Sequence, residues 1–173
     1  MKTILLVFLT FLISFNANAQ LEENYDTTDE TVLIFTRHAE KEAATDPDPS
    51  LSEEGQKRVE KLKVLLQRYD SLDAIYSTDY NRTRQTAGPV AGYFNKSITI
   101  YDPRNLEAFK QMILETHTNE KILIVGHSNT TPALINLIMG EERLEPFDEK
   151  DYSNLYIIRI PQDEAPVLKH YKY

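Results

Sequence analysis

Residues 31–41 read TVLIFTRHAEK, an apolar run of β-branched and aromatic residues that stops abruptly at Arg37 and His38. Such a run is typical of a buried strand in an open α/β sheet. Sheets of this kind bind ligands where their strands end. We therefore expect Arg37 and His38 to lie at the floor of a functional site.

A second strand of the same character is predicted at residues 121–125, which read KILIV and are followed by Gly126, His127 and Ser128. The carboxyl ends of parallel strands meet at one edge of a sheet. If the two strands are parallel, His38 and His127 emerge at the same edge.

The remaining pattern predicts strands alternating with amphipathic helices. Helical spacing of apolar residues indicates helices at 53–70, 82–94, 106–113 and 130–139, the first capped by Ser52 and the last stopped by Gly140. The Gly88-Pro89 pair disfavours helix in the middle of 82–94. Further strands are expected at 73–77, 98–101, 153–160 and 167–171. The prediction is a single three-layer α/β/α domain over residues 31–173, with a largely parallel central sheet. The proline-containing loop at 43–50 is expected to line the mouth of the site.

The composition excludes several kinds of chemistry. The 173 residues include no cysteine, which excludes disulfides, zinc-thiolate sites and a cysteine nucleophile. The formal net charge is -8 and no basic run is present, so nucleic acid is not expected as a partner.

The N-terminal segment has the pattern of a secretory signal peptide. Lys2 precedes an apolar stretch at 4–15, and Ala17-Asn18-Ala19 forms an A-x-A cleavage site. We predict a signal peptide at 1–19, a flexible leader at 20–30 and an exported protein, periplasmic or extracellular, without stable membrane association after cleavage. An uncleaved anchor is the alternative. The sequence does not indicate an oligomeric state.

Two arginines and two histidines form the candidate site. The guanidinium forks of Arg37 and Arg82 match a phosphoryl group. Helix starts near Asn81 and after Ser128 would add N–H donors for its oxygens. The candidate nucleophiles are a histidine nitrogen, a hydroxyl or a carboxylate. Neutral imidazole needs no metal or adjacent base, so His38 is the natural nucleophile, with His127 as a phosphate ligand that becomes useful when protonated.

The same residues are compatible with other functions. His38 and His127 with Asp79 or Asp102 could ligate a cation, but no His-x-x-x-His or carboxylate cluster has ligand spacing, so neither a metal nor a cofactor is expected. A non-catalytic phosphoryl-binding or interaction protein would keep the same pocket. A phosphomutase is a further alternative.

Four segments, in order along the chain, carry a family resemblance. They are Arg37-His38-Ala39, LSEEG at 51–55, YST at 76–78 with RTRQTA at 82–87, and Gly126-His127-Ser128. Together they resemble the histidine phosphatase superfamily, which includes phosphoglycerate mutases and phosphohistidine phosphatases. The commonest family form is Arg-His-Gly, from which Ala39 departs.

The resemblance implies a phosphatase acting on a small phosphorylated substrate, either a phosphomonoester or a phosphoramidate. His38 would form a phosphohistidine intermediate that water then hydrolyses. Arg37, His127 and Arg82, rather than Arg84, would hold the phosphoryl oxygens, with Ser128 beside them. Many members place a glutamate general acid after the third strand. Here Asp102 is the first candidate for that role and Glu107 the second. Arg58, Lys61 and Arg84 are predicted to be solvated helix residues, and His117 and His170 to be surface residues.

Overall fold

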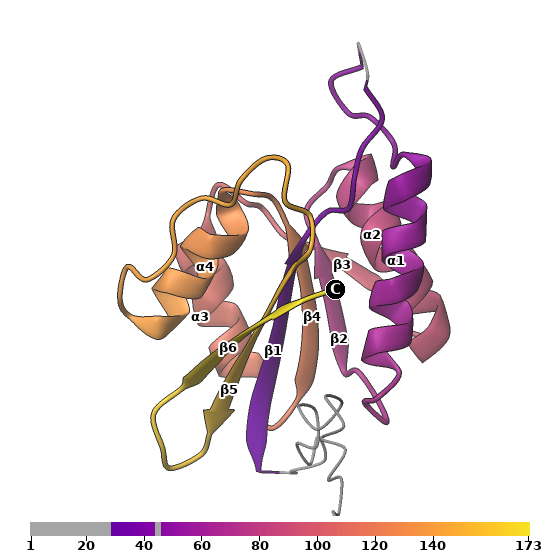
Figure 1. The fold of residues 1–173 in the computed structure, drawn as a ribbon. Helices are drawn as coiled ribbons and strands as arrows, with labels where there is room; N and C mark the ends of the chain where they lie inside the picture. The colour runs from indigo at the N-terminus through magenta and orange to yellow at the C-terminus, as the bar shows by residue number, and fades with distance from the viewer. Residues whose placement is uncertain (1–28, 44–45) are drawn as a thin grey trace, which may run out of the picture.

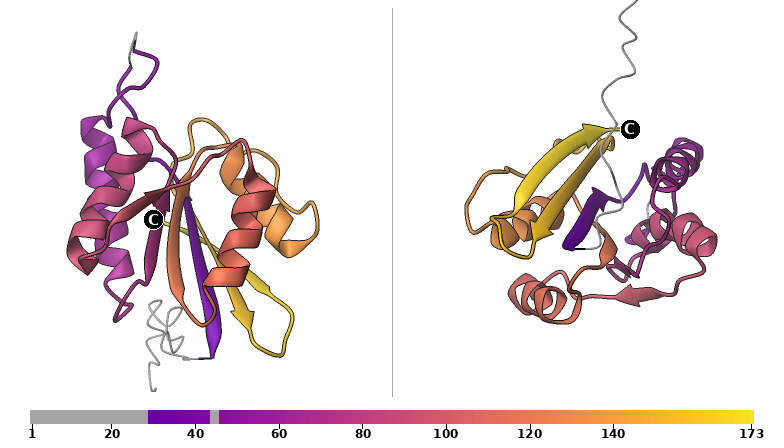
Figure 2. Two further views of the ribbon diagram at one scale, coloured as in Figure 1. Left: turned by 180° about the vertical axis from the view of Figure 1, so that it is seen from behind. Right: turned by 90° about the horizontal axis from the view of Figure 1, so that it is seen from below.

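The computed structural model describes residues 29–43 and 46–173, which form a six-stranded sheet with helices on both faces (Figures 1 and 2). The predicted signal peptide and nearly all of the predicted leader lie outside these residues. Glu30, the last leader residue, is already the first residue of the first strand. No helix within the described ranges is long and apolar enough to cross a membrane. The bounds of the elements are β1 (Glu30–Arg37), α1 (Glu53–Leu66), β2 (Ala74–Ser77), α2 (Asn81–Phe94), β3 (Ile98–Ile100), α3 (Leu106–Thr116), β4 (Lys121–Gly126), α4 (Thr130–Met139), β5 (Asn154–Pro161) and β6 (Val167–Lys172).

The strand order across the sheet is β3-β2-β4-β1-β5-β6. The pairs β3/β2, β2/β4 and β4/β1 are parallel, whereas β5 is antiparallel to β1 and β6 is antiparallel to β5. A short connection after β5 can only make an antiparallel hairpin, because a parallel pair needs a longer crossover. The predicted three-layer α/β/α fold with a mostly parallel sheet is confirmed, with an antiparallel edge.

Two hydrophobic cores lie between the sheet and the helix layers. Helices α1 and α2 cover one face of the sheet, and α3 and α4 cover the other (Figure 1). On α1, Val59, Leu62 and Leu66 recur at three- to four-residue spacing and are all buried, which explains why this helix packs on the sheet through one side. The sheet contributes apolar side chains to both cores, as its continuous apolar strands predict.

Two helix ends have the predicted capping residues, whereas α1 ends at Leu66, before the predicted residue 70, and α2 differs in its interior. The Ser52 hydroxyl accepts a hydrogen bond from the Gly55 N–H at 3.2 Å, and Gly140 ends α4 at a φ of 70°. Helix α2 continues through Gly88 and Pro89, although the pair was expected to disfavour helix there. Packing of α2 against α1 and the sheet therefore outweighs the one backbone donor that Pro89 removes.

The register of the parallel strands brings three strand ends together. Arg37 at the end of β1 is paired with Gly126 at the end of β4, and the His38 N–H donates to the Gly126 carbonyl at 2.9 Å. On the other side of β4, Ser77 at the end of β2 is paired with Val125. The residues that follow β1, β4 and β2 therefore share one edge of the sheet.

Candidate active site

His38 is placed by the end of β1 and is almost completely buried, with 4% of its surface exposed. Its Nδ1 atom lies 2.7 Å from the carbonyl oxygen of Ala39. Because a carbonyl can only accept, Nδ1 carries the proton and Nε2 keeps its lone pair. Burial, reinforced by the charges of Arg37 and Arg82, lowers the pKa of His38 to about 3. The ring is therefore a neutral imidazole at physiological pH, with a free nitrogen.

His127 follows β4 and faces His38. The two ring centroids are 5.6 Å apart at an interplanar angle of 67°. Nε2 of His127 lies 2.9 Å from Oγ1 of Thr78, whose hydroxyl donates to Thr83. Burial, then the charges of Arg82 and Arg37, lowers the pKa of His127 to about 4. The site therefore holds two neutral imidazoles within the electrostatic reach of two guanidinium groups.

Arg37 is fully buried and is wrapped by a segment from the other end of the chain. Its Nη1 donates to the carbonyl of Asp148 at 3.0 Å, and its Nη2 pairs with the Glu149 carboxylate at 3.1 Å. The Tyr152 ring packs 4.2 Å from the guanidinium carbon. The Nε of Arg37 has no hydrogen-bond partner among the described residues. A buried donor without a partner is costly, which indicates a place for a ligand acceptor.

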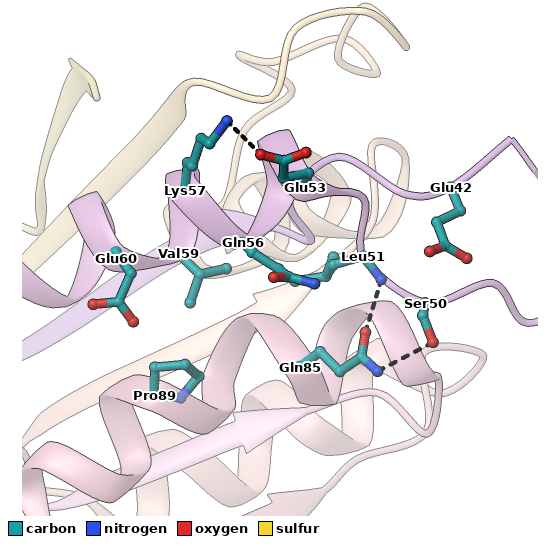
Figure 3. Close-up of a pocket in the computed structure, with 10 residues that line it drawn as sticks. All are labelled: Glu42, Ser50, Leu51, Glu53, Gln56, Lys57, Val59, Glu60, Gln85 and Pro89. Carbon is teal, nitrogen blue, oxygen red and sulfur yellow. Dashed lines mark hydrogen bonds and ion pairs between the residues drawn. The ribbon is translucent and has the colours of Figure 1, made fainter.

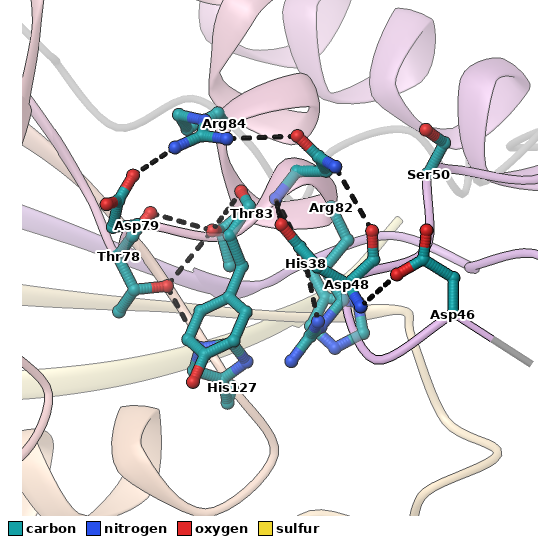
Figure 4. A network of polar contacts seen from close by, with 12 residues as sticks. His38, Asp46, Asp48, Ser50, Thr78, Asp79, Arg82, Thr83, Arg84 and His127 are labelled. Atoms are coloured by element: carbon teal, nitrogen blue, oxygen red, sulfur yellow. Dashed lines mark hydrogen bonds and ion pairs between the residues drawn. The ribbon is translucent and has the colours of Figure 1, made fainter.

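Arg82 lies in the first turn of α2 with its side chain 15% exposed. It packs against the Tyr80 ring at 4.4 Å, and its Nη1 is 3.5 Å from Asp48. Its Nε likewise has no partner within the described part of the chain. Arg84 points elsewhere and pairs with Asp79 (Figure 4). Of the two arginines, Arg82 is therefore the one that lines a cavity with His38 and His127.

A cavity of about 440 Å³ opens over these groups. Figure 4 shows that His38, His127 and Arg82 approach one another from three different segments. The cavity is lined by His38, Lys41, Tyr80, Arg82, Pro103, Arg104, His127, Ser128, Asn129, Thr130 and Glu149. Of the predicted set, His38, Arg82, His127 and Ser128 thus line one cavity, whereas Arg37 is fully buried next to His38 in the chain and is not among the lining residues.

The two predicted general acids do not line this cavity. Asp102 is exposed and pairs with Arg104 at 2.9 Å, and hydrogen bonds from that arginine lower the pKa of its carboxyl group. Glu107 pairs with Lys110 at 2.6 Å. A general acid must lie beside the reacting group and carry a proton there. Neither carboxyl group lies in the cavity, so neither is placed for that role.

Several residues around the site were not predicted. Glu149 and Tyr152 contact Arg37 from an irregular segment before β5, where no periodic pattern indicates a role. Asp48 belongs to the proline-containing loop expected at the mouth, and it accepts from the Asn81 N–H at 2.9 Å. In the sequence, the only signal for Asp48 is the Asp-Pro-Asp-Pro pattern of that loop.

Two residues predicted to be solvated have specific partners. Arg58 donates to both carboxylate oxygens of Glu40, at 2.6 and 2.8 Å to Oε1 and 2.9 Å to Oε2, and its side chain is 21% exposed. His117 lies 2.7 Å from the Tyr76 hydroxyl and is largely buried, which corrects its assignment to the surface.

A larger cavity of about 660 Å³ lies between α1 and α2, away from the histidines (Figure 3). Its only cation among the described lining residues is Lys57, which is paired with Glu53 at 2.9 Å. Glu42 and Glu60 add further negative charge. This cavity does not suit a phosphoryl group. In residues 29–43 and 46–173, no group of three or more ligating side chains is placed to hold a metal ion.

Comparison with known proteins agrees with this architecture. The family model described as histidine phosphatase superfamily (branch 1) matches residues 33–108. No curated protein sequence matches the chain. A provisionally assigned phosphohistidine phosphatase SixA from Agrobacterium tumefaciens superposes with a TM-score of 0.63 at 24% identity, covering 82% of this chain and 98% of that one.

Two structures solved with bound ligands share the fold. The protein histidine phosphatase SixA complexed with tungstate has a TM-score of 0.64 at 13% identity, covering 82% of this chain and 96% of its own. Phosphoserine phosphatase from Entamoeba histolytica, in complex with 3-phosphoglyceric acid, has a TM-score of 0.63 at 16% identity, covering 83% and 97%. The family model thus matches residues 33–108, and these likenesses show that the chain has the fold of these phosphatases.

Proposed function

We propose that this protein is a metal-independent phosphatase that hydrolyses a phosphomonoester or phosphoramidate through a phosphohistidine on His38. The observation that carries the proposal is the hydrogen bond from Nδ1 of His38 to the Ala39 carbonyl, 2.7 Å long. It fixes the tautomer in which Nε2 has the lone pair. A neutral nitrogen nucleophile is then available in a pocket lined by Arg82, with the buried Arg37 next to it in the chain.

In the first step, Nε2 of His38 attacks phosphorus. A P–N bond to His38 forms while the bond from phosphorus to the leaving oxygen or nitrogen breaks. Arg37 and Arg82 each retain an unpartnered Nε–H, and they stabilise the charge on the phosphoryl oxygens. A bound dianion also favours protonation of His127, which then donates to a phosphoryl oxygen.

In the second step, water attacks the phosphorus, the P–N bond to His38 breaks and inorganic phosphate leaves. The leaving group of the first step takes its proton from solvent at the open mouth, since Asp102 and Glu107 do not line the cavity. Substrates with a good leaving group, such as phosphoramidates, are therefore favoured over alkyl phosphates.

The test is phosphate release from p-nitrophenyl phosphate and from phosphohistidine, with and without EDTA. We expect turnover by the wild type, insensitivity to EDTA and loss of turnover in His38→Ala. The matched control is His170→Asn, because His170 is exposed on β6 and outside the cavity. A phosphoenzyme that is labile in acid and stable in base would identify phosphohistidine. Vanadate binding without turnover of either substrate would instead favour a phosphoryl-binding protein.

We further propose that the mature enzyme works outside the cytoplasm, on the basis of the A-x-A pattern at 17–19. Mass spectrometry of protein recovered from the exported fraction should find Gln20 as the first residue. An intact N-terminus in the cytoplasmic fraction would contradict export.

A further inference from the structure

Glu149 occupies two hydrogen-bond donors at the proposed phosphoryl site, one on Arg37 and one on Ser128. Its Oε2 lies 3.1 Å from Nη2 of Arg37, and its Oε1 accepts from the Ser128 hydroxyl. Ser128 and Glu149 both line the cavity above His38. Both oxygens of the carboxylate are therefore engaged with phosphate-site donors, as two phosphoryl oxygens would be.

The second arginine also has a carboxylate beside it, but that contact differs in kind. Asp48 is fixed by the Asn81 N–H, at 2.9 and 3.1 Å to its two oxygens, and it reaches Arg82 only at 3.5 Å. This carboxylate caps the start of α2 and has a structural partner of its own. The Glu149 side chain is 74% exposed and is bound through Arg37 and Ser128. Of the two carboxylates, Glu149 is therefore the one that a ligand can displace from its arginine.

The backbone around Glu149 does not depend on its side chain. The carbonyls of Asp148 and Asp151 accept from Nη1 of Arg37 at 3.0 and 3.4 Å, and the Tyr152 ring packs on the guanidinium. Rotation of the Glu149 side chain into solvent would free Nη2 and the Ser128 hydroxyl and leave the other contacts to Arg37 in place. Displacement therefore needs a rotamer change and no movement of the segment.

We propose that Glu149 is an internal anion that competes with the phosphoryl group for Arg37 and Ser128, and so weakens the binding of substrate and of product phosphate. The inference rests on the proposed function only in treating the cavity as a phosphoryl site. A protein whose binding-competent state is a minor fraction binds its ligand more weakly by that fraction. The same competition returns phosphate to solvent after hydrolysis.

The test compares orthovanadate and inorganic phosphate binding, by titration calorimetry, between the wild type and Glu149→Gln. We expect the variant to bind both anions about tenfold more tightly. This factor corresponds to a wild type in which roughly a tenth of the molecules have Glu149 turned away from Arg37, and to a variant in which every molecule can bind the anion. The control is Glu145→Gln, which removes the same charge from the same segment at an exposed position outside the cavity lining. It should bind as the wild type does.

The titrations are repeated at high NaCl concentration to separate competition from a through-space charge effect. Direct competition keeps the difference between Glu149→Gln and wild type, whereas a purely through-space effect shrinks with screening. Equal or weaker anion binding by Glu149→Gln, or a difference that vanishes at high salt, overturns the inference. If Glu149→Gln does not fold, Glu149→Asp replaces it, because the shorter carboxylate cannot span Arg37 and Ser128 and should give the same tightening.

Turnover measured on the same samples separates the two proposals. Tighter anion binding by Glu149→Gln with no turnover by the wild type supports competition and rejects the phosphatase. Normal turnover with unchanged anion binding rejects competition alone. Failure of both proteins to bind vanadate rejects both proposals.

Discussion

The imidazole rings of His38 and His127 lie 5.6 Å apart in a site that keeps both of them neutral. Burial lowers the pKa of His38 to about 3 and that of His127 to about 4, from an ordinary value of 6.5. The unfolded chain therefore binds more protons than the folded one below pH 6.5. We predict that the free energy of unfolding is highest above pH 6.5 and falls by about 3 kcal/mol per histidine toward pH 4.

Urea unfolding at a series of pH values checks this stability prediction. A His38→Asn, His127→Asn double variant lacks the two groups and should lose less stability on acidification than the wild type. Carboxylates titrate in both proteins, so the difference between them isolates the histidines. Parallel curves for the two proteins would show that neither histidine is held neutral by the fold.

Replacement of Arg82 separates the phosphate-binding arginine from its neighbour. Arg82→Lys keeps the charge but loses the Nε–H, and we predict a fall in kcat/KM of about a hundredfold or more. Arg84→Lys is the matched control, because Arg84 pairs with Asp79 outside the cavity lining, and it should change kcat/KM less than threefold. Equal losses in the two variants would remove Arg82 from the site.

The main part of this site could be read from the sequence because it depends on strand ends. An apolar strand followed by a histidine predicts both the buried element and the place where its polar residue emerges. Since β1 and β4 are parallel neighbours, His38 and His127 had to share an edge. The capping residues Ser52 and Gly140 likewise act locally, so their neighbours in sequence were sufficient to predict them.

The remainder of the site depends on contacts that leave no local pattern. Glu149 and Tyr152 reach Arg37 from an irregular segment, and only the tertiary fold brings them there. Asp102 was chosen by its position after the third strand, but its side chain turns to Arg104. Arg58 looked like a solvated helix residue because its partner Glu40 is distant in sequence.

Asp102 gives a direct test of whether a carboxylic acid after β3 takes part in turnover. It lies outside the cavity lining, and hydrogen bonds from Arg104 lower its pKa, so it is ionised at neutral pH. We predict that Asp102→Asn changes kcat less than threefold, on phosphohistidine as well as on p-nitrophenyl phosphate. A loss of a hundredfold or more, of the size expected for a general acid, would restore Asp102 as the proton donor.

The ion pair between Glu40 and Arg58 connects the segment after His38 to helix α1. Its three N–H···O contacts measure 2.6, 2.8 and 2.9 Å, and both side chains are 21% exposed. We predict that Glu40→Gln and Arg58→Met each lower the free energy of unfolding by about 2 kcal/mol, because each leaves a partly buried partner charge. The double variant should lose less than the sum, as urea unfolding in a double-mutant cycle would measure.

Gly55 makes a second and tighter contact between α1 and the same segment. A Cβ atom at Gly55 would lie 2.1 Å from the Glu40 carbonyl oxygen, whereas one at Gly92 would meet nothing within 4 Å. We predict that Gly55→Ala destabilises the fold by about 3 kcal/mol, because a backbone oxygen cannot move aside as a flexible side chain can. Gly92→Ala, in the exposed part of α2, should stabilise it by about 1 kcal/mol through helix propensity.

The two glycine variants also test whether the contact of α1 with Glu40 positions His38. Any shift that relieves the clash at Gly55 moves the Glu40 carbonyl, which is close along the chain to the Ala39 carbonyl that accepts from Nδ1 of His38. Gly55→Ala should therefore lower kcat/KM in conditions where circular dichroism shows it still folded, and Gly92→Ala should leave kcat/KM unchanged. Unchanged turnover in folded Gly55→Ala would mean that α1 stabilises the domain without orienting the nucleophile.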